Sequence, residues 1–243
     1  VTQYDMNCLE DVGMLKMDFL GLKTLTVIHD AVEAVKARVG ELRHPEAGTV
    51  FESMDDVSLD DPAVYKMLAR GGTSGVFQFE SKLAIEKLRA MRCDRFDDLV
   101  ATNALIRPGP LDSGMADAYI RRKTGREEVR YDHPDLQPVL ESTYGIIVYQ
   151  EQVMRIANVL GGYNLAEADV LRKAMGKKIA SLIREELTQF VAKAIARGVE
   201  KKTAETLAEQ IETFGRYGFN LSHSAAYSII AYHTAWLKAH YPA

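Results

Sequence analysis

Apolar residues recur at intervals of three or four along most of the chain, a spacing typical of helices with one buried face. The first such stretch runs from about residue 22 to Val39 and ends at Gly40. Further stretches predict helices over residues 80–90, 95–105, 114–124, 148–160, 165–175, 178–197, 201–215 and 222–240. The pattern therefore predicts a mainly α, multi-helical fold.

Breakers and capping residues separate these stretches. A polar segment that contains proline and glycine, residues 41–58, is expected to be a linker. Asp60-Asp61-Pro62 then opens a short helix, because proline is accepted in a first turn, and Gly71-Gly72 ends it. The chain has no periodic repeat, so we expect a compact helical domain rather than a solenoid.

One short segment alternates instead. From Met14 to Phe19 polar and apolar residues take turns, which predicts a short β-strand with Lys16 and Asp18 side by side on one face. A lone strand cannot satisfy its own backbone hydrogen bonds. The sheet that this strand joins is therefore expected outside the chain, or only weakly formed within it.

Composition narrows the class of protein. A chain of 243 residues that is 47% hydrophobic can build one large or two small cores. We find no apolar run of about 18 residues and no secretion signal, so we expect a cytoplasmic protein without membrane contact. Cys8 and Cys93 have no metal-ligand spacing and are expected to be free thiols in a reducing compartment, where they serve as simple packing residues.

The net charge of −4 hides an asymmetry. Residues 1–98 carry 12 Lys and Arg against 18 Asp and Glu, whereas residues 99–243 carry 18 against 16. The second part is therefore the candidate binder of a polyanion. Its basic residues cluster at 121–126 and at Arg172, Lys173, Lys177 and Lys178, although such runs are also typical of solvated helix faces.

The stretch from Arg216 to Tyr227 brings Asn220, Ser222 and His223 to the start of the last predicted helix. Free backbone N–H groups and the helix dipole favour an anion at such a position. A single histidine is more often a packing residue, so His223 depends on this context. The aromatic residues nearby either stack on a base or sugar or belong to the core.

Arg107 and Asp18 each allow two interpretations. Arg107 stands before Pro-Gly-Pro, which predicts a rigid turn with the guanidinium at its edge. It either binds a phosphate through its planar fork or caps the preceding helix. Asp18, between two apolar residues, either pairs with Lys16 or ligates a metal.

Six motifs occur in order along the chain: LKMDFLGL at 15–22, GVFQFES at 75–81, RPGP at 107–110, TYGI and YQEQ at 143–152, RKAMGKK at 172–178 and YGFNLSHSAAY at 217–227. Together they closely resemble the alpha subunit of bacterial DNA polymerase III, a family C replicative polymerase. The resemblance covers essentially the whole chain. A single short motif can match by chance, but six motifs in the same order do not.

The resemblance implies that residues 1–24 complete a palm domain and that residues 25–243 form most of the fingers. It implies that Asp18 is the third of three catalytic aspartates and binds Mg²⁺, with two such ions stabilising the attacking and leaving oxygens. No Asp-x-Asp pair precedes Asp18, so the isolated chain is expected to be inactive. The expected partners are the primer-template DNA, the deoxynucleoside triphosphate (dNTP), the rest of the alpha subunit and the other holoenzyme subunits.

The resemblance also implies which residues contact nucleotide or DNA. They are Lys16, Arg107, Arg172, Lys173, Lys177, Lys178, Asn220, Ser222 and His223. Two positions depart from the family pattern, because Leu221 stands where a lysine is usual and His233 stands where glutamine is frequent. The expected cation beside Ser222 is therefore missing, unless Arg216 or Lys178 covers the same charge.

Two functions of other classes also fit parts of the sequence. A helical nucleic-acid-binding module without a nucleotide site would explain the basic clusters and would bind DNA in a salt-sensitive way that dNTP does not affect. A helical scaffold for protein interaction would use the charges only for solubility. The scaffold leaves the positions of Arg107 and Asp18 without a reason.

Overall fold

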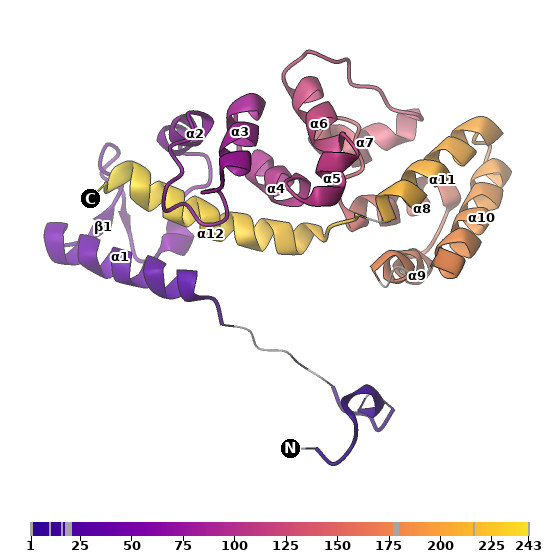
Figure 1. Cartoon of the computed structure of the whole chain (residues 1–243), viewed down its shortest axis with the longest axis horizontal. Coiled ribbons are helices and arrows are strands. Elements are labelled where there is room, and N and C mark those ends of the chain that lie inside the picture. The colour runs from indigo at the N-terminus through magenta and orange to yellow at the C-terminus, as the bar shows by residue number, and fades with distance from the viewer. Residues whose placement is uncertain are drawn as a thin grey trace.

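The computed structural model describes residues 2–9, 11–15, 17, 21–176, 180–215 and 217–242, and helices dominate it (Figure 1). The α-helices are α1 (Lys23–Val39), α2 (Pro62–Ala69), α3 (Lys82–Met91), α4 (Phe96–Leu105), α5 (Pro108–Asp112), α6 (Met115–Lys123), α7 (Gln137–Leu140), α8 (Gln150–Gly161), α9 (Leu165–Gly176), α10 (Ala180–Ala196), α11 (Lys201–Gly215) and α12 (Leu221–His240). Strands β1 (Leu42–Arg43) and β2 (Val50–Phe51) form an antiparallel hairpin. Single 3₁₀ turns lie at Met6–Cys8, Met54–Asp56, Pro134–Leu136 and Glu141–Thr143. The predicted mainly α fold is confirmed.

The long helices begin and end within two residues of the predicted stretches. Two short helices, α5 and α7, were not predicted, and the expected linker contains the β1–β2 hairpin. The turn expected at Pro108 is helical because both Pro108 and Pro110 fall in the first turn of α5, where their missing N–H groups are not needed. Prolines that seem to exclude a helix therefore begin one here.

The strand predicted over residues 14–19 is not found at its described positions. Met14, Leu15 and Met17 are exposed and belong to no strand, whereas Lys16, Asp18 and Phe19 lie outside the described residues. The described part of the first 17 residues lies apart from the helical body (Figure 1). The described residues offer no strand beside Met14, Leu15 and Met17, so the backbone there has no ladder to join.

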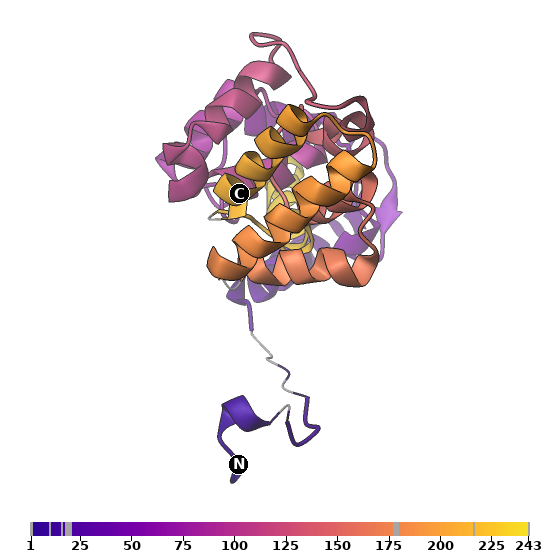
Figure 2. The same ribbon diagram turned by 90° about the vertical axis from the view of Figure 1, so that its right-hand side faces the viewer.

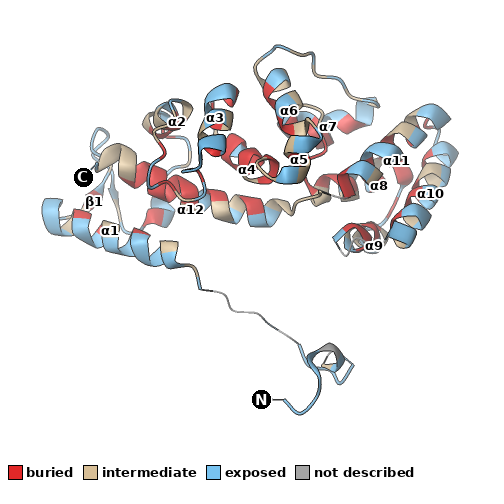
Figure 3. Cartoon of the chain, in the orientation of Figure 1, coloured by how far each residue is buried: buried red, intermediate tan, exposed pale blue. Residues whose placement is uncertain are grey.

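Helix α12 runs through the middle of the molecule beneath α2, α3 and α4 (Figure 1) and packs on α1, α2 and α4. Trp236 and Tyr232 on this helix are completely buried. Burying an aromatic side chain of this size contributes about 4–6 kcal/mol before the cost of ordering the chain. Figure 3 shows that the buried residues of α12 gather in its C-terminal half, which leaves its N-terminal half partly open.

A second core lies where α8, α9, α10 and α11 pack together, and Figure 2 looks onto this group. A smaller cluster between α4 and α6 joins the two cores, and Phe219 and Leu221 pack against it. The start of α12 therefore lies where the two halves of the helical body meet. None of the helices in the described residues is both long and apolar enough to cross a membrane.

A histidine–aspartate cluster ties the far end of α12 to the hairpin. His44 Nε2 and His240 Nε2 lie 2.9 and 2.6 Å from the same oxygen of Asp61, the residue that caps α2. Burial alone would raise the pKa of Asp61, but hydrogen bonds from His240, the Ala63 N–H and His44 hold the pKa below its usual value. The ionised carboxylate therefore stabilises the fold.

We predict that Asp61→Asn lowers the free energy of unfolding by about 1–3 kcal/mol at neutral pH, because two histidines lose their charged acceptor. The folded pKa lies below the unfolded value of about 3.9, so the stabilisation is complete above that pH and is lost as the pH falls through the folded pKa. Urea titrations of both proteins between pH 7 and pH 2.5 measure this. A stability difference that stays constant over that range would contradict the role given to Asp61.

The turn between α4 and α5 is pressed against the segment that precedes α12. Arg107 donates through Nε to the Ala104 carbonyl, 2.9 Å away, and through Nη2 to the Tyr217 carbonyl, 2.7 Å away. A Cβ atom on Gly109 would lie 1.9 Å from Cδ1 of Tyr217. Glycine is required here because the tyrosine ring occupies the space of a side chain.

We predict that Gly109→Ala lowers the free energy of unfolding by about 1–3 kcal/mol, because the ring of Tyr217 must move away. Gly176→Ala is the matched control, since no described atom outside its own helix backbone lies within 4 Å of the added Cβ there. Urea unfolding of both variants gives the two values. Equal stability of Gly109→Ala and the unchanged protein would show that the contact with Tyr217 is not a constraint.

Candidate functional site

The start of α12 is already capped by side chains of the protein. Asn220 Oδ1 accepts the N–H of His223 at 2.8 Å. The carboxylate of Glu151 accepts the Leu221 N–H at 2.9 Å and the Asn220 amide at 2.8 Å. An anion at this helix start would compete with Glu151, so the side chains of the first turn are better placed to bind one than its backbone is.

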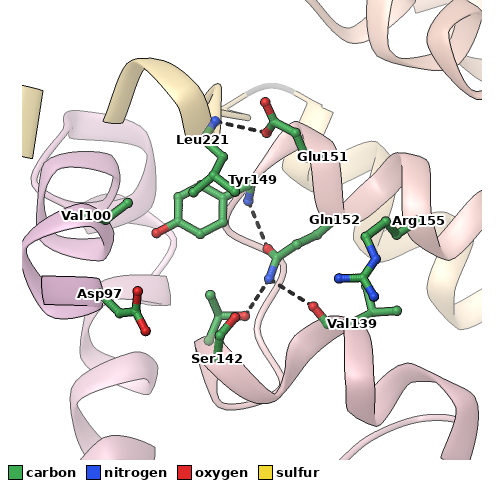
Figure 4. A pocket seen from close by; sticks show the side chains of 10 residues that line it. Asp97, Val100, Val139, Ser142, Tyr149, Glu151, Gln152, Arg155 and Leu221 are labelled. Carbon is green, nitrogen blue, oxygen red and sulfur yellow. Dashed lines mark hydrogen bonds between the residues drawn. The ribbon is translucent and has the colours of Figure 1, made fainter. Parts of the chain in front are cut away.

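Figure 4 shows the recess beside this cap, a cavity of about 170 Å³ between α4, α8 and the start of α12. Gln152 at its base accepts from the N–H groups of Val148 and Tyr149 at 2.8 and 3.0 Å. The Leu221 side chain also lines this cavity, at the position where the resemblance leads one to expect a lysine. The bonds of Gln152 hold the turn before α8 in place, and the cation that lines this cavity is Arg155 of α8 rather than a lysine of the first turn of α12.

A second cleft, of about 200 Å³, opens on another side of the same helix start. It brings together residues from the turn before α3, from the end of α4 and from the first turns of α12. They are Gln78, Asn103, Ile106, Arg107, Phe219, His223, Ser224 and Tyr227. Arg107 and His223, which are 116 positions apart in the sequence, thus share one cleft.

Arg107 is anchored but keeps its positive charge. Its bond to the Ala104 carbonyl is the helix-capping role that the sequence allowed, and its guanidinium carbon lies 4.2 Å from the centre of the Phe219 ring. Within the described part of the chain, no carboxylate forms an ion pair with it. Burial lowers the pKa of Arg107, because a partly buried site disfavours an uncompensated cation. An anion in the cleft would supply that compensation.

The ring of His223 is held between two aromatic residues. It stacks on Tyr227, with centroids 4.3 Å apart and planes at 29°, and meets the edge of Phe219 at 5.4 Å. His223 is exposed, and its ring makes no hydrogen bond to any described residue. Ser222 is also exposed, but it does not line the cleft. The imidazole is therefore oriented by packing while its nitrogens face solvent.

The basic clusters behave differently, because carboxylates pair with most of them. Arg172 and Lys173 on α9 both bind Asp169, at 2.7 and 2.9 Å, and lie away from the cleft. In the 121–126 run, Arg121 and Arg122 share Glu127, and Lys123 is buried against Asp98 and Asp94. Burial raises the pKa of Asp98, although Lys123 and the Asp94 N–H oppose this. Lys16, Asp18, Lys177 and Lys178 lie outside the described residues, as does Arg216.

Sequence reasoning did not assign roles to three polar residues of the cleft, Gln78, Asn103 and Ser224. Asn103 and Ser224 join α4 to α12, through Asn103 Nδ2 to Ser228 at 2.7 Å and Ser224 Oγ to the Val100 carbonyl at 2.6 Å. Gln78 belongs to the GVFQFES motif, but nothing in that motif indicates where its side chain lies. Only the packing of α4 and of the turn before α3 on α12 brings these side chains into one cleft.

One group of ligand-type side chains occurs in the described residues, the cluster of His44, Asp61 and His240. The Nδ1 atom of His44 accepts the backbone N–H groups of Ala47 and Glu46 at 3.1 and 3.3 Å, so its Nε2 must carry the proton that Asp61 accepts. A metal-bound histidine has the opposite arrangement, with its second nitrogen donating. This cluster is a hydrogen-bonded tie and does not fit Mg²⁺, which also prefers oxygen ligands.

Comparisons with known proteins agree with the motifs. Residues 24–213 match the family described as the bacterial DNA polymerase III alpha subunit finger domain. The whole chain aligns with "DNA polymerase III subunit alpha" of Aquifex aeolicus at 51% identity and of Pseudomonas fluorescens at 45% identity. It also aligns at 46% identity with the protein of that name from Escherichia coli K12.

The chain covers 20% of the Aquifex protein and 21% of the other two, and so spans about a fifth of the length of these relatives. The matched range contains Arg107, and the alignments with the relatives extend through the start of α12. With a family match over residues 24–213, the chain belongs to the bacterial DNA polymerase III alpha subunit finger domain family.

Proposed function

We propose that this chain is the fingers part of a replicative DNA polymerase and that the cleft between α4 and α12 binds the phosphates of an incoming dNTP. The observation that carries the proposal is Arg107, a partly buried guanidinium on the cleft wall without an ion pair among the described residues. Arginine presents a rigid fork that matches phosphate oxygens. His223 adds a ring nitrogen beside it.

The charges around the cleft support an anion rather than a cation. Helix α12 contains no aspartate or glutamate over its whole length, and none of the described acidic residues lines the cleft. The rings of Tyr227 and Phe219 form part of the wall and offer apolar surface to a sugar or base. A phosphate group attached to a flat heterocycle fits both features.

The roles of the remaining candidate residues are inferred from the family resemblance. Residues 1–24 would complete the palm, and the family match that begins at residue 24 supports this boundary for the fingers at 25–243. Asp18 would bind Mg²⁺, which supplies charge stabilisation to the transferring phosphoryl group. Lys16 would contact the triphosphate. Arg172, Lys173, Lys177 and Lys178 would face DNA or nucleotide, with Asn220 and Ser222 supporting His223.

The partners follow from the same proposal. A polymerase of this family would act on primer-template DNA and dNTP, in the cytoplasm, with the rest of the alpha subunit and the other holoenzyme subunits. Arg172 and Lys173 both form ion pairs with the carboxylate of Asp169, and this pairing affects how strongly they can bind DNA. These two cations must exchange an intramolecular partner for a DNA phosphate, so their contribution to binding is smaller than that of unpaired cations.

We predict that Arg107→Ala weakens dNTP binding by about 10- to 100-fold and His223→Ala by about 3- to 10-fold, since charged hydrogen bonds are worth more than neutral ones. Backbone amide NMR of the chain titrated with dNTP measures both. Arg107→Lys keeps the charge and tests the fork, and Arg121→Ala is the control for loss of a paired surface cation. Shifts with DNA but none with dNTP would replace the proposal by a nucleic-acid-binding module.

We also predict that the purified 243-residue chain does not extend a primer in the presence of Mg²⁺ and all four dNTPs, because it carries only one of the three expected aspartates. A gel-based extension assay, with an intact polymerase of the family as the positive control, measures this. Extension that depends on Asp18 would mean that the chain holds a complete active site.

A further inference from the structure

Gln78 occupies a backbone conformation that usually requires glycine. Two four-residue turns follow each other before α3, closed by the Val76 N–H to Thr73 O at 2.9 Å and by the Phe79 N–H to Val76 O at 3.1 Å. The third position of the first turn is Gly75, with φ of 74°, and that of the second is Gln78, with φ of 66°. Positive φ at this position favours glycine or asparagine, and other side chains are strained there.

The other non-glycine residues with positive φ in the described chain have structural reasons for it. Arg92 ends α3 in the left-handed conformation that is usual after a helix. Tyr144 ends a 3₁₀ turn, packs its ring on Tyr119 and accepts a hydrogen bond from Arg95. Gln78 ends no helix and packs in no core. Its strain therefore calls for a different reason.

The loop holds Gln78 firmly in this place. Val76 and Phe79 on either side are completely buried, and the Phe77 N–H donates to Thr234 of α12 at 3.1 Å. The Phe77 ring packs on Tyr227, which is itself part of the cleft wall. These anchors bring the Gln78 side chain to the cleft together with Arg107 and His223.

The amides in the cleft differ in what they bind. Asn103 donates to Ser228 and is engaged within the fold. The Gln78 amide makes no hydrogen bond to any described residue, although it can donate two and accept two. A neutral amide suits uncharged hydrogen-bonding groups, whereas a phosphate suits Arg107. The cleft thus offers a charged group, Arg107, and an uncharged amide, Gln78, which suit the charged and the uncharged part of one ligand.

We propose that Gln78 contacts the nucleoside half of the bound nucleotide, through the sugar 3′-hydroxyl or the hydrogen-bonding edge of the base, while Arg107 and His223 hold phosphate. The proposal rests on the proposed function and names the residue that recognises the uncharged part of the substrate. The strained turn is retained because glycine, although relaxed there, carries no amide. By this hydrogen bond Gln78 would orient the nucleoside before the reaction.

The test compares Gln78→Gly with Gln78→Glu in the intact polymerase subunit that contains this segment. Gln78→Gly relieves the strain and removes the amide, and Gln78→Glu keeps the shape but loses the donors. We expect both to raise KM for dNTP by about 3- to 10-fold with a smaller change in kcat. Arg92→Gly is the matched control, because it relieves the same kind of strain outside the cleft and leaves KM unchanged.

Two nucleotide analogues identify the contacted group. One is a dideoxynucleoside triphosphate without the 3′-hydroxyl, and the other is a purine analogue without the minor-groove acceptor N3. The unchanged polymerase discriminates against the analogue that lacks the contacted group, and Gln78→Gly loses that discrimination. Thermal unfolding of Gln78→Gly at or above the normal temperature excludes misfolding as the cause.

The proposal is overturned if Gln78→Gly leaves KM unchanged, or if both analogues are discriminated against equally by the variant and by the unchanged polymerase. Arg107→Ala, measured beside it, separates this outcome from failure of the nucleotide site itself. If Arg107→Ala raises KM for dNTP and Gln78→Gly does not, the phosphate site holds and the role of Gln78 fails. If neither does, the proposed function fails as well.

Discussion

The packing of α12 on α4 is the interaction on which the rest of the structure depends. Small and hydroxyl residues on α12 allow close approach, and Ser224 and Ser228 are completely buried in bonds to Val100 and Asn103 of α4. Buried hydroxyls that satisfy a partner's polar groups specify register as well as proximity. The C-terminal half of α12 enters one core, and its first turn reaches the junction with the other. The cleft exists because this helix pair fixes both of its walls.

Ion pairs distinguish the basic residues that stabilise the fold from Arg107, the basic residue that lines the cleft. Lys123 is buried against Asp98, and Arg172 and Lys173 share Asp169, so these basic residues have partners inside the fold. Arg107 has backbone carbonyls and an aromatic face instead, which orient it without neutralising it. Solvated and paired charges contribute little to specific binding, whereas an oriented and unneutralised guanidinium favours an anion strongly.

The sequence predicted correctly where α12 starts, but it did not indicate which side chain caps that start. The sequence places Asn220, Ser222 and His223 in a first helical turn, and the structure places them there. Glu151, 69 positions before Asn220, supplies the carboxylate that caps this turn. No local pattern indicates a cap that comes from another helix, because the pairing depends on how α8 meets α12.

The sequence by itself determined the helices, since a 3.6-residue period of apolar side chains can be buried in only one regular conformation. It also determined the order of motifs that identifies the family. Only the tertiary structure decided that the RPGP turn begins α5, which cations are paired, and that Gln78, Arg107 and His223 share a cleft. Each of these depends on contacts between residues far apart in the chain, and a local period carries no information about such distances.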